Sequence, residues 1–195
     1  MTDFRIRQTL ARTEHLVETF QLLCKRADVL RPALAVDDEM LAGRFVPAPA
    51  ALRLRRAARL IVLDAETRAL MFRYDVPGRA PFWVTAGGEC EPDESFEDAA
   101  RRELREETGI TADPGSQIAR MTPEFITVEG EPVQADERFF LVRVAEARID
   151  TSGHTETELA LMTQHRWFTL DELENWHEAV FPVNLADMIR SHIAT

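Results

Sequence analysis

The residues best suited to chemistry lie in one acidic stretch, residues 87–110, which reads GGECEPDESFEDAARRELREETGI. In it, Glu103, Glu106 and Glu107 are three and four residues apart, so a helix would place their carboxylates on one face. Hard divalent cations prefer such oxygen ligands. The spacing therefore indicates a cation site. The alternative is a solvated helix face whose charge is neutralised by neighbouring arginines.

The three carboxylates are unfavourable for a helix by themselves. Like charges four residues apart destabilise a helix by about 0.2–0.5 kcal/mol per pair. Ser95 predicts the start of this helix and Gly109 its end. Glu106 and Glu107 would then lie in the last turn, where the helix dipole disfavours negative charge. A bound cation would offset these penalties, and so would the neighbouring Arg101, Arg102 and Arg105, so the helix alone leaves both interpretations open.

The charge of the whole chain excludes some classes of partner. The 195 residues carry 23 basic and 34 acidic side chains, a formal net charge of −11, and residues 89–107 alone hold 9 acidic against 3 basic residues. Sequence-independent binding to DNA or to an anionic membrane requires clustered Lys and Arg, so we expect no membrane partner. The acid excess also disfavours nucleic acid, while the basic residues within 1–60 leave an mRNA-type substrate open. An anionic small molecule stays compatible with the acidic stretch when a divalent cation mediates the contact.

The acidic stretch resembles the signature of the Nudix hydrolase family. That signature is Gly, five residues, Glu, seven residues, then Arg-Glu-apolar-any-Glu-Glu-any-Gly-apolar, and each fixed position is present from Gly88 through Glu94 to Arg102–Ile110. The wider resemblance covers about residues 55–195. Where the family often has Pro-Gly-Gly, this chain has Ala-Gly-Gly, a change that removes no ligand.

The resemblance implies hydrolysis of a nucleoside diphosphate linked to another group, by attack of water on a diphosphate phosphorus. Bound Mg²⁺ or Mn²⁺ would neutralise the phosphate oxygens and lower the pKa of the water. The residues that match the family's metal ligands are Glu103, Glu106, Glu107 and Gly88 through its carbonyl. Arg102 and Glu94 match the pair that orients the loop and the helix. The alternative function is a nucleotide-binding sensor module without turnover.

The general base and the substrate contacts stay open at this point. The base is either a helix glutamate, Glu103 or Glu106, or a glutamate of the loop expected over His154–Trp167. In that loop Glu158 is the first candidate and Glu156 the second, and a surface carboxylate is the alternative for both. Glu137 is a further candidate metal ligand.

The substrate contacts are predicted from residue type alone. Trp83 or Phe82 would stack on a base, and Arg73 would meet a phosphate. Aromatic residues in a strand are more often part of a core, which is the alternative for the first two.

The elements that must position these residues indicate an α/β (α+β) domain. We expect a Nudix-like α/β/α sandwich with a mixed sheet, preceded by an N-terminal helical extension. The expected strands are Ala57–Leu63, Ala69–Tyr74, Phe82–Thr85, 117–129, 137–147 and His165–Phe168. The expected helices of the domain are 95–108, 170–177 and 184–194.

The first 50 residues have a different pattern. Apolar residues at three- and four-residue spacing predict an amphipathic helix over 8–30, and the proline-containing stretch 32–50 reads as a linker. We therefore divide the chain into an extension, 1–50, and a Nudix hydrolase domain, 51–195. The apolar face of the helix predicts a homodimer contact. With no apolar run of 18 residues and no signal peptide, we expect a cytoplasmic protein.

Overall fold

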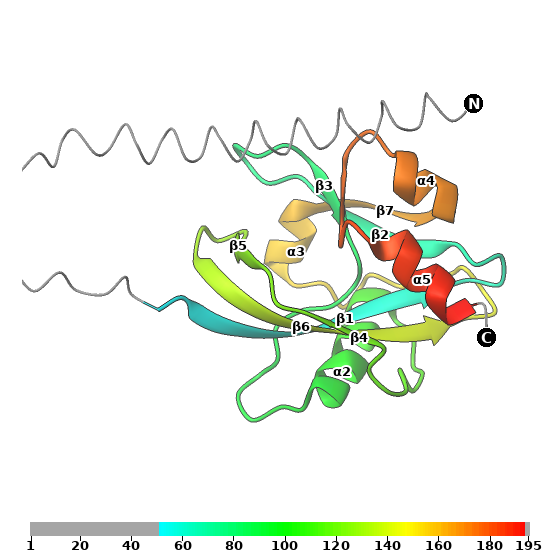
Figure 1. Ribbon diagram of the computed structural model, residues 1–195, viewed down its shortest axis with the longest axis horizontal. Helices are drawn as coiled ribbons and strands as arrows, with labels where there is room; N and C mark the ends of the chain where they lie inside the picture. The colour runs from blue at the N-terminus through cyan, green and yellow to red at the C-terminus, as the bar shows by residue number, and fades with distance from the viewer. Residues whose placement is uncertain (1–50, 194–195) are drawn as a thin grey trace, which may run out of the picture. The chain divides into compact units, whose positions relative to one another are not determined.

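The computed structural model of the protein describes residues 51–193 (Figure 1). Residues 1–50 and 194–195 lie outside the described part. The helix expected over 8–30, the linker over 32–50 and the division of the chain at residue 50 therefore stay predictions.

Eight strands and four helices make up the described part of the chain. The strands are β1 (Arg53–Leu63), β2 (Ala69–Tyr74), β3 (Phe82–Val84), β4 (Ala119–Met121), β5 (Glu124–Ile126), β6 (Pro132–Arg143), β7 (Met162–Phe168) and β8 (Ala179–Phe181). The helices are α2 (Phe96–Thr108), α3 (Glu156–Leu161), α4 (Leu170–Asn175) and α5 (Leu185–Ile193). None of these helices is long and apolar enough to cross a membrane.

The strands form one mixed sheet in the order β4-β6-β1-β2-β3-β8, with β5 also paired to β6 and β7 to β2. β1 and β6 run parallel and are paired from Arg53↔Val133 to Leu63↔Arg143. β3 and β8 are also parallel, and the other pairs are antiparallel. The long β1–β6 pair supports the loops of the site.

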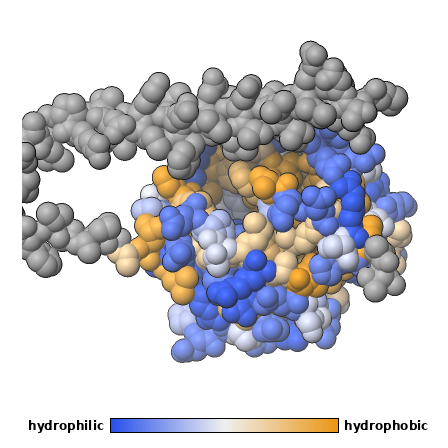
Figure 2. All heavy atoms as spheres, viewed as in Figure 1, coloured by the Kyte–Doolittle hydropathy of each residue, from blue (hydrophilic) through white to orange (hydrophobic). Residues whose placement is uncertain are grey.

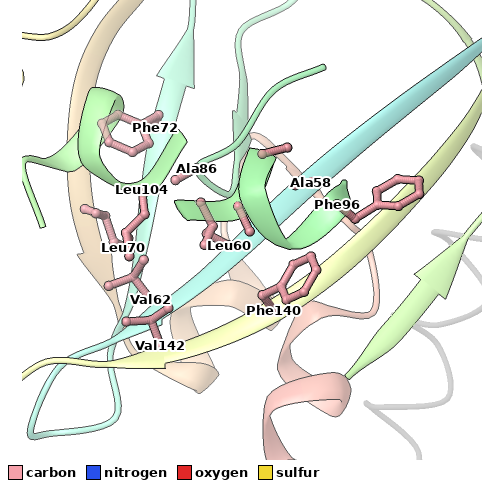
Figure 3. Close-up of a cluster of buried hydrophobic side chains, with 12 residues drawn as sticks. Ala58, Leu60, Val62, Leu70, Phe72, Ala86, Phe96, Leu104, Phe140 and Val142 are labelled. Atoms are coloured by element: carbon pink, nitrogen blue, oxygen red, sulfur yellow. The ribbon is translucent and has the colours of Figure 1, made fainter. Parts of the chain in front are cut away.

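Hydrophobic cores lie on both faces of the sheet because successive side chains of β1 point to opposite faces. On one face, Leu60 and Val62 pack against Leu104 of α2 (Figure 3). On the other face, Ile61 and Leu63 belong to a cluster that includes residues of α4 and α5. Figure 1 shows α2 on one side of the β1–β6 pair and α4 and α5 on the other. The expected mixed sheet with helices on both faces is confirmed.

Local signals explain the bounds of α2. The Ser95 side chain accepts a hydrogen bond from the Asp98 N–H at the first turn, and Gly109 ends the helix at φ 69°, a left-handed conformation that favours glycine. Phe96, Leu104 and two alanines bury the apolar face. The same sequence signals predicted this helix, and its bounds are confirmed within a residue.

The structure differs from the expected elements in the second half of the domain. The single strand expected over 117–129 is two short strands, β4 and β5, on either side of Pro123, whose ring removes a ladder donor. The strand expected at 137–147 begins earlier, at Pro132, and ends at Arg143. The stretch expected as a loop, His154–Trp167, contains α3 and most of β7. β8 was not expected at all.

Candidate active site

The glycine loop that opens the acidic stretch lies directly against β1. The Ala58 N–H donates to the Gly88 carbonyl at 3.0 Å, and the Leu60 N–H donates to the Ala86 carbonyl at 2.8 Å. Gly87 between them has φ 122°, and a Cβ at this position would lie 2.1 Å from the Ala58 carbonyl oxygen. Only glycine permits this approach, so the Gly-Gly pair allows the loop to contact β1 closely.

The loop also meets α2 at the two buried glutamates. The Gly87 N–H donates to Glu107 Oε2 at 2.7 Å. A Cβ on Gly88 would lie 2.4 Å from Glu103 Oε1. The structure thus brings together three of the four residues that match metal ligands: Gly88, Glu103 and Glu107.

Burial disfavours the charged forms of both glutamates. Glu107 is 3% exposed, and burial, with a contribution from the nearby Glu103 charge, raises its pKa to about 8. Burial also raises the pKa of Glu103, while the hydrogen bond from Arg102 opposes the change. Without a cation, burial therefore shifts both carboxyl groups toward their neutral forms.

Arg102 joins the loop and the helix around this pair. Its guanidinium donates to both carboxylate oxygens of Glu94, at 3.0 and 2.9 Å, and this pairing lowers the pKa of Glu94. The same group donates to Glu103 Oε1 at 2.7 Å and to Glu106 Oε2 at 3.1 Å. Arg102 and Glu94 thus have the geometry expected of an orienting pair. Glu106 is half-exposed and turns toward Arg102.

The donor set fits a hard divalent cation by its chemistry. Glu103 and Glu107 are buried neighbours that lack a full counter-charge, and Glu106 lies one turn away from Glu103 on the same helix. In the described residues, no three acidic, histidine or cysteine side chains converge as a ready-made cage, because Arg102 holds Glu103 and Glu106. A cation would compete with Arg102 for these oxygens.

A cavity of about 1260 Å³ opens from the two glutamates. Aromatic and apolar side chains line part of it: Tyr74, Phe82, Phe125, Ile126 and Phe181. Figure 2 shows hydrophobic residues gathered at a hollow on the face in view, with hydrophilic residues beside them. The cavity is large enough for a nucleotide-sized ligand. It is acidic at the end formed by Glu103, Glu107 and Glu158.

Glu158 reaches the cavity because the segment before α3 is docked on the end of α2. The His154 ring lies with Nε2 2.9 Å from the Glu107 carbonyl oxygen. A Cβ on Gly153 would lie 2.4 Å from the Glu106 carbonyl oxygen. In α3, Glu158 Oε2 accepts from the Thr155 N–H at 2.7 Å in a capping box. Glu158 lines the cavity, whereas Glu156 is exposed and lies outside its lining.

Arg73 and Trp83, which were expected to contact the substrate, are not among the residues that line the cavity, and their contact with the substrate stays a prediction. Trp83 is 2% exposed, and its Nε1 donates to Glu178 Oε2 at 2.6 Å. Arg73 donates to the same carboxylate at 2.7 Å through Nη2. Both residues therefore hold the segment before β8 against β2 and β3. Phe82, the other aromatic candidate, does line the cavity.

Two arginines of β1 that the sequence reasoning missed also line the cavity. They are Arg55 and Arg59. Arg59 donates to the Gly87 carbonyl at 3.0 Å and to Glu137 Oε1 at 2.9 Å. Glu137, a candidate metal ligand in the sequence, is thus paired with an arginine. The alternation of arginines at residues 53, 55 and 59 was the available signal, because side chains two residues apart share one face of a strand.

Comparison with known proteins agrees with the site's geometry. The family model described as NUDIX domain matches residues 53–187. RNA pyrophosphohydrolase of Erythrobacter litoralis (strain HTCC2594) is 31% identical over 137 residues, which cover 63% of this chain and 80% of that protein. Oxidized purine nucleoside triphosphate hydrolase of Mus musculus is 32% identical over 91 residues, 47% of this chain and 51% of that protein.

Solved structures show the same fold. The MutT protein from Methanosarcina mazei Go1 superposes with a TM-score of 0.53 at 20% identity, over 75% of this chain and 97% of that chain. The E. coli ORF135 protein superposes with a TM-score of 0.51 at 21% identity, over 76% and 94% of the two chains.

Proposed function

The chain belongs to the Nudix family of pyrophosphohydrolases, whose domain it carries over residues 53–187, and we propose that its substrate is a nucleoside diphosphate linked to another group. The observation that carries this proposal is the pair of buried carboxyl groups, Glu103 and Glu107, packed against the Gly87–Gly88 loop at one end of a large cavity. The name of the Erythrobacter litoralis relative gives RNA as its substrate, and that of the Mus musculus relative gives an oxidized purine nucleoside triphosphate. Both substrates carry nucleoside phosphates, which supports the substrate class proposed here.

Each residue of the proposed site has a distinct role. Glu103, Glu106 and Glu107 would hold Mg²⁺ or Mn²⁺, and the bound cation would neutralise phosphate oxygens and activate the attacking water. The Gly88 carbonyl accepts the Ala58 N–H and keeps a second lone pair that can serve as a ligand. Arg102, anchored by Glu94, keeps the glutamates in place.

We assign the general base to Glu158. It lines the cavity with Glu103 and Glu107, and its charge contributes to the raised pKa of both. One carboxylate oxygen, Oε2, accepts the capping bonds of α3. The other oxygen, Oε1, is left to accept a proton from water in the cavity. Its proximity to the buried pair favours Glu158 over Glu156.

A substrate panel tests the proposal directly. The purified protein is incubated with nucleoside triphosphates, ADP-ribose, nucleotide sugars and dinucleoside polyphosphates, in Mg²⁺ or in Mn²⁺, and released phosphate or nucleoside monophosphate is measured. We expect product from at least one member of the panel, and no product in EDTA.

The same samples distinguish the sensor alternative. Calorimetric binding of a panel member that is unaltered by EDTA and yields no product with either cation would contradict the hydrolase proposal. A rise of Tm on addition of Mn²⁺ is expected of a chain whose carboxylates hold the cation.

A further inference from the structure

The floor of the cavity, beyond the glutamate end, is built from one face of β1. Arg55, Ala57 and Arg59 are two residues apart along β1, so their side chains point to the same face of the sheet. Both arginines line the cavity. Ala57 between them is fully buried and small, so it leaves space between two long basic side chains. Along this face each arginine pairs with a glutamate that also lines the cavity, Arg55 with Glu89 and Arg59 with Glu137.

The positive charge of the Arg55 guanidinium is only partly compensated by ion pairs and hydrogen bonds. The Arg55 side chain is 15% exposed, and its one ion pair within the described part of the chain joins Nε to Glu89 Oε2 at 3.2 Å. Glu89 also pairs with Arg53. In residues 51–193, the buried Arg55 Nη1 makes no hydrogen bond. Burial lowers the pKa of the Arg55 guanidinium and the nearby Arg59 charge lowers it further, while the charges of Glu89 and Glu137 only partly oppose the change. The surroundings of Arg55 therefore favour an additional negative charge.

Arg59 offers donors on the same floor. A guanidinium has five N–H groups. Arg59 uses Nε and Nη2 on Glu137 and one N–H of Nη1 on the Gly87 carbonyl. Two of its five N–H groups are left for a ligand. Because Gly87 also donates to Glu107, Arg59 lies between the β1 floor of the cavity and its glutamate end.

We propose that Arg55 and Arg59 form a subsite for an anionic oxygen group, a phosphate or a carboxylate, that the substrate carries outside the bond that is cleaved. The inference rests on the proposed function and narrows its substrate class. A planar guanidinium matches the paired oxygens of phosphate and carboxylate, and its charge is delocalised. An anion at the exposed edge of Arg55 therefore compensates the whole group, including the shielded Nη1.

The alternative ligand for this floor is an uncharged carbonyl group. A carbonyl would accept a hydrogen bond from either arginine, but it would add no charge to offset the repulsion between Arg55 and Arg59. Hydrogen bonds between charged partners are about twice as strong as neutral ones. An anionic group is therefore the better complement.

Binding of inorganic pyrophosphate in EDTA tests the subsite without catalysis. Titration calorimetry compares the wild type, Arg55→Met, Arg55→Lys and Arg120→Met. Methionine keeps an apolar stem but removes the charge, and lysine keeps the charge. Arg120→Met removes the same charge from β4, outside the cavity lining. We expect Arg55→Met to weaken binding about tenfold or more, Arg55→Lys to keep part of the affinity, and Arg120→Met to change it less than about twofold.

Paired substrates then identify the source of the anion. GTP against GDP tests an additional phosphate, and UDP-glucuronate against UDP-glucose tests a carboxylate on the distal group. In one pair, the wild type should show a kcat/KM about tenfold or more higher for the member with the additional anion. Arg55→Met should lose that preference, because its kcat/KM falls by a larger factor for the member with the additional anion than for the other member.

The outcomes separate the subsite from the proposed function. Equal pyrophosphate affinity in the wild type and Arg55→Met, or no binding by the folded wild type, would overturn the subsite whatever the turnover. Arg55-dependent binding of pyrophosphate by a protein that hydrolyses no substrate would support the subsite and count against the proposed function.

Discussion

Glu107 is buried, cannot be fully compensated by its neighbours, and lies at the point where the glycine loop meets α2. In the described residues, the one hydrogen bond to its carboxyl group comes from the Gly87 N–H. Such a buried site destabilises the ionised form of the Glu107 carboxyl group. The same property favours cation binding, because a cation removes the penalty. At this residue, stability without metal and function oppose each other.

Glu107→Gln should separate these two properties. Gln keeps an acceptor for Gly87 but cannot ionise, so we expect cation-dependent turnover to fall by about 100-fold or more. Because the pKa of Glu107 is raised in the folded protein, the stabilisation from its neutral form is fully present below pH 4.5. It is lost as the pH rises through about 8. In EDTA, the Tm of the variant should therefore exceed that of the wild type, by a margin that grows over this range.

Thermal denaturation in EDTA between pH 5 and pH 9 and a kinetic assay in Mg²⁺ check both parts. The control is Glu97→Gln, an exposed glutamate in the first turn of the same helix. Undiminished turnover in Glu107→Gln would refute its assignment as a ligand.

At the residue scale, the sequence located the acidic end of the site better than the rest. Glu103, Glu107, Arg102 and Glu94 follow each other closely in the chain, so their relation is set by one loop and one helix. Residues such as Arg73 and Arg59 are brought near or away from the site by strand pairing across long separations. Strand sequence alone does not decide which face of the sheet meets the cavity.

The short helix α3 shows how an element of six residues is held by its neighbours rather than by its own propensity. Isolated helices of this length are unstable in water. Here the capping box of Thr155 and Glu158 starts the helix, and the Asp150 N–H donates to the Thr108 carbonyl at 2.8 Å. The end of α2 therefore sets the position of α3 and with it the carboxylate of Glu158.

Replacement of Glu158 by Gln tests its assignment as general base. Gln preserves the capping pattern but cannot accept a proton, so kcat should fall by about 10²-fold or more while Tm changes little. Glu156→Gln, on the same helix but outside the cavity lining, should keep its kcat. Equal kcat values for both variants would contradict the assignment and return the role of base to a glutamate of α2.

The ion pair of Arg73 and Glu178 ties the segment before β8 to β2, while Trp83 adds a bond from β3. The hydrogen bonds from Arg73 lower the pKa of Glu178 to about 2. A carboxylate with a lowered pKa stabilises the fold above its ordinary pKa of 4.5, and this contribution is lost as pH falls through about 2.

We therefore expect Glu178→Gln to destabilise the protein by about 1–2 kcal/mol at neutral pH, since solvent partly screens the pair. The difference in Tm between wild type and variant should shrink on acidification below pH 4.5. Glu146→Gln, an exposed position, is the control. A difference that is constant between pH 7 and pH 3 would show that ionisation of Glu178 is not the cause.

At the element scale, predictions succeeded where the signal is local. The bounds of β2 are those expected, and α2 has its cap at Ser95 and its end at Gly109 as expected. The three-residue strand β8 has no periodicity to detect, and it exists because β3 offers it a parallel edge. Short elements of this kind depend on tertiary pairing and are not encoded in their own residues.

For the molecule as a whole, the net charge of −11 has two parts. The acidic end of the cavity accounts for one part as a candidate cation site. Many of the other acidic residues are paired on the surface, as in Arg166–Glu172 and Arg190–Glu174. Such exposed pairs contribute little to stability. The net charge of the chain is therefore more informative about the proposed ligand than about the stability of the fold.

The homodimer predicted from residues 8–30 belongs to this scale as well. Light scattering on the full chain should give the mass of a dimer, and deletion of residues 1–45 should give a monomer, because it removes the apolar face of the predicted helix. Circular dichroism of the shortened chain controls for loss of structure. A monomer before and after the deletion would contradict the prediction.

β1 serves two purposes at once, and this restricts how the protein can evolve. Its cavity face carries Arg55 and Arg59, while Ala58 and Leu60 between and beyond them belong to the core under α2. Insertion or deletion of one residue within the strand would exchange the two faces and turn arginines into the core. New substrates can therefore be acquired by substitution at alternate positions of this strand, while its length has to be inherited unchanged.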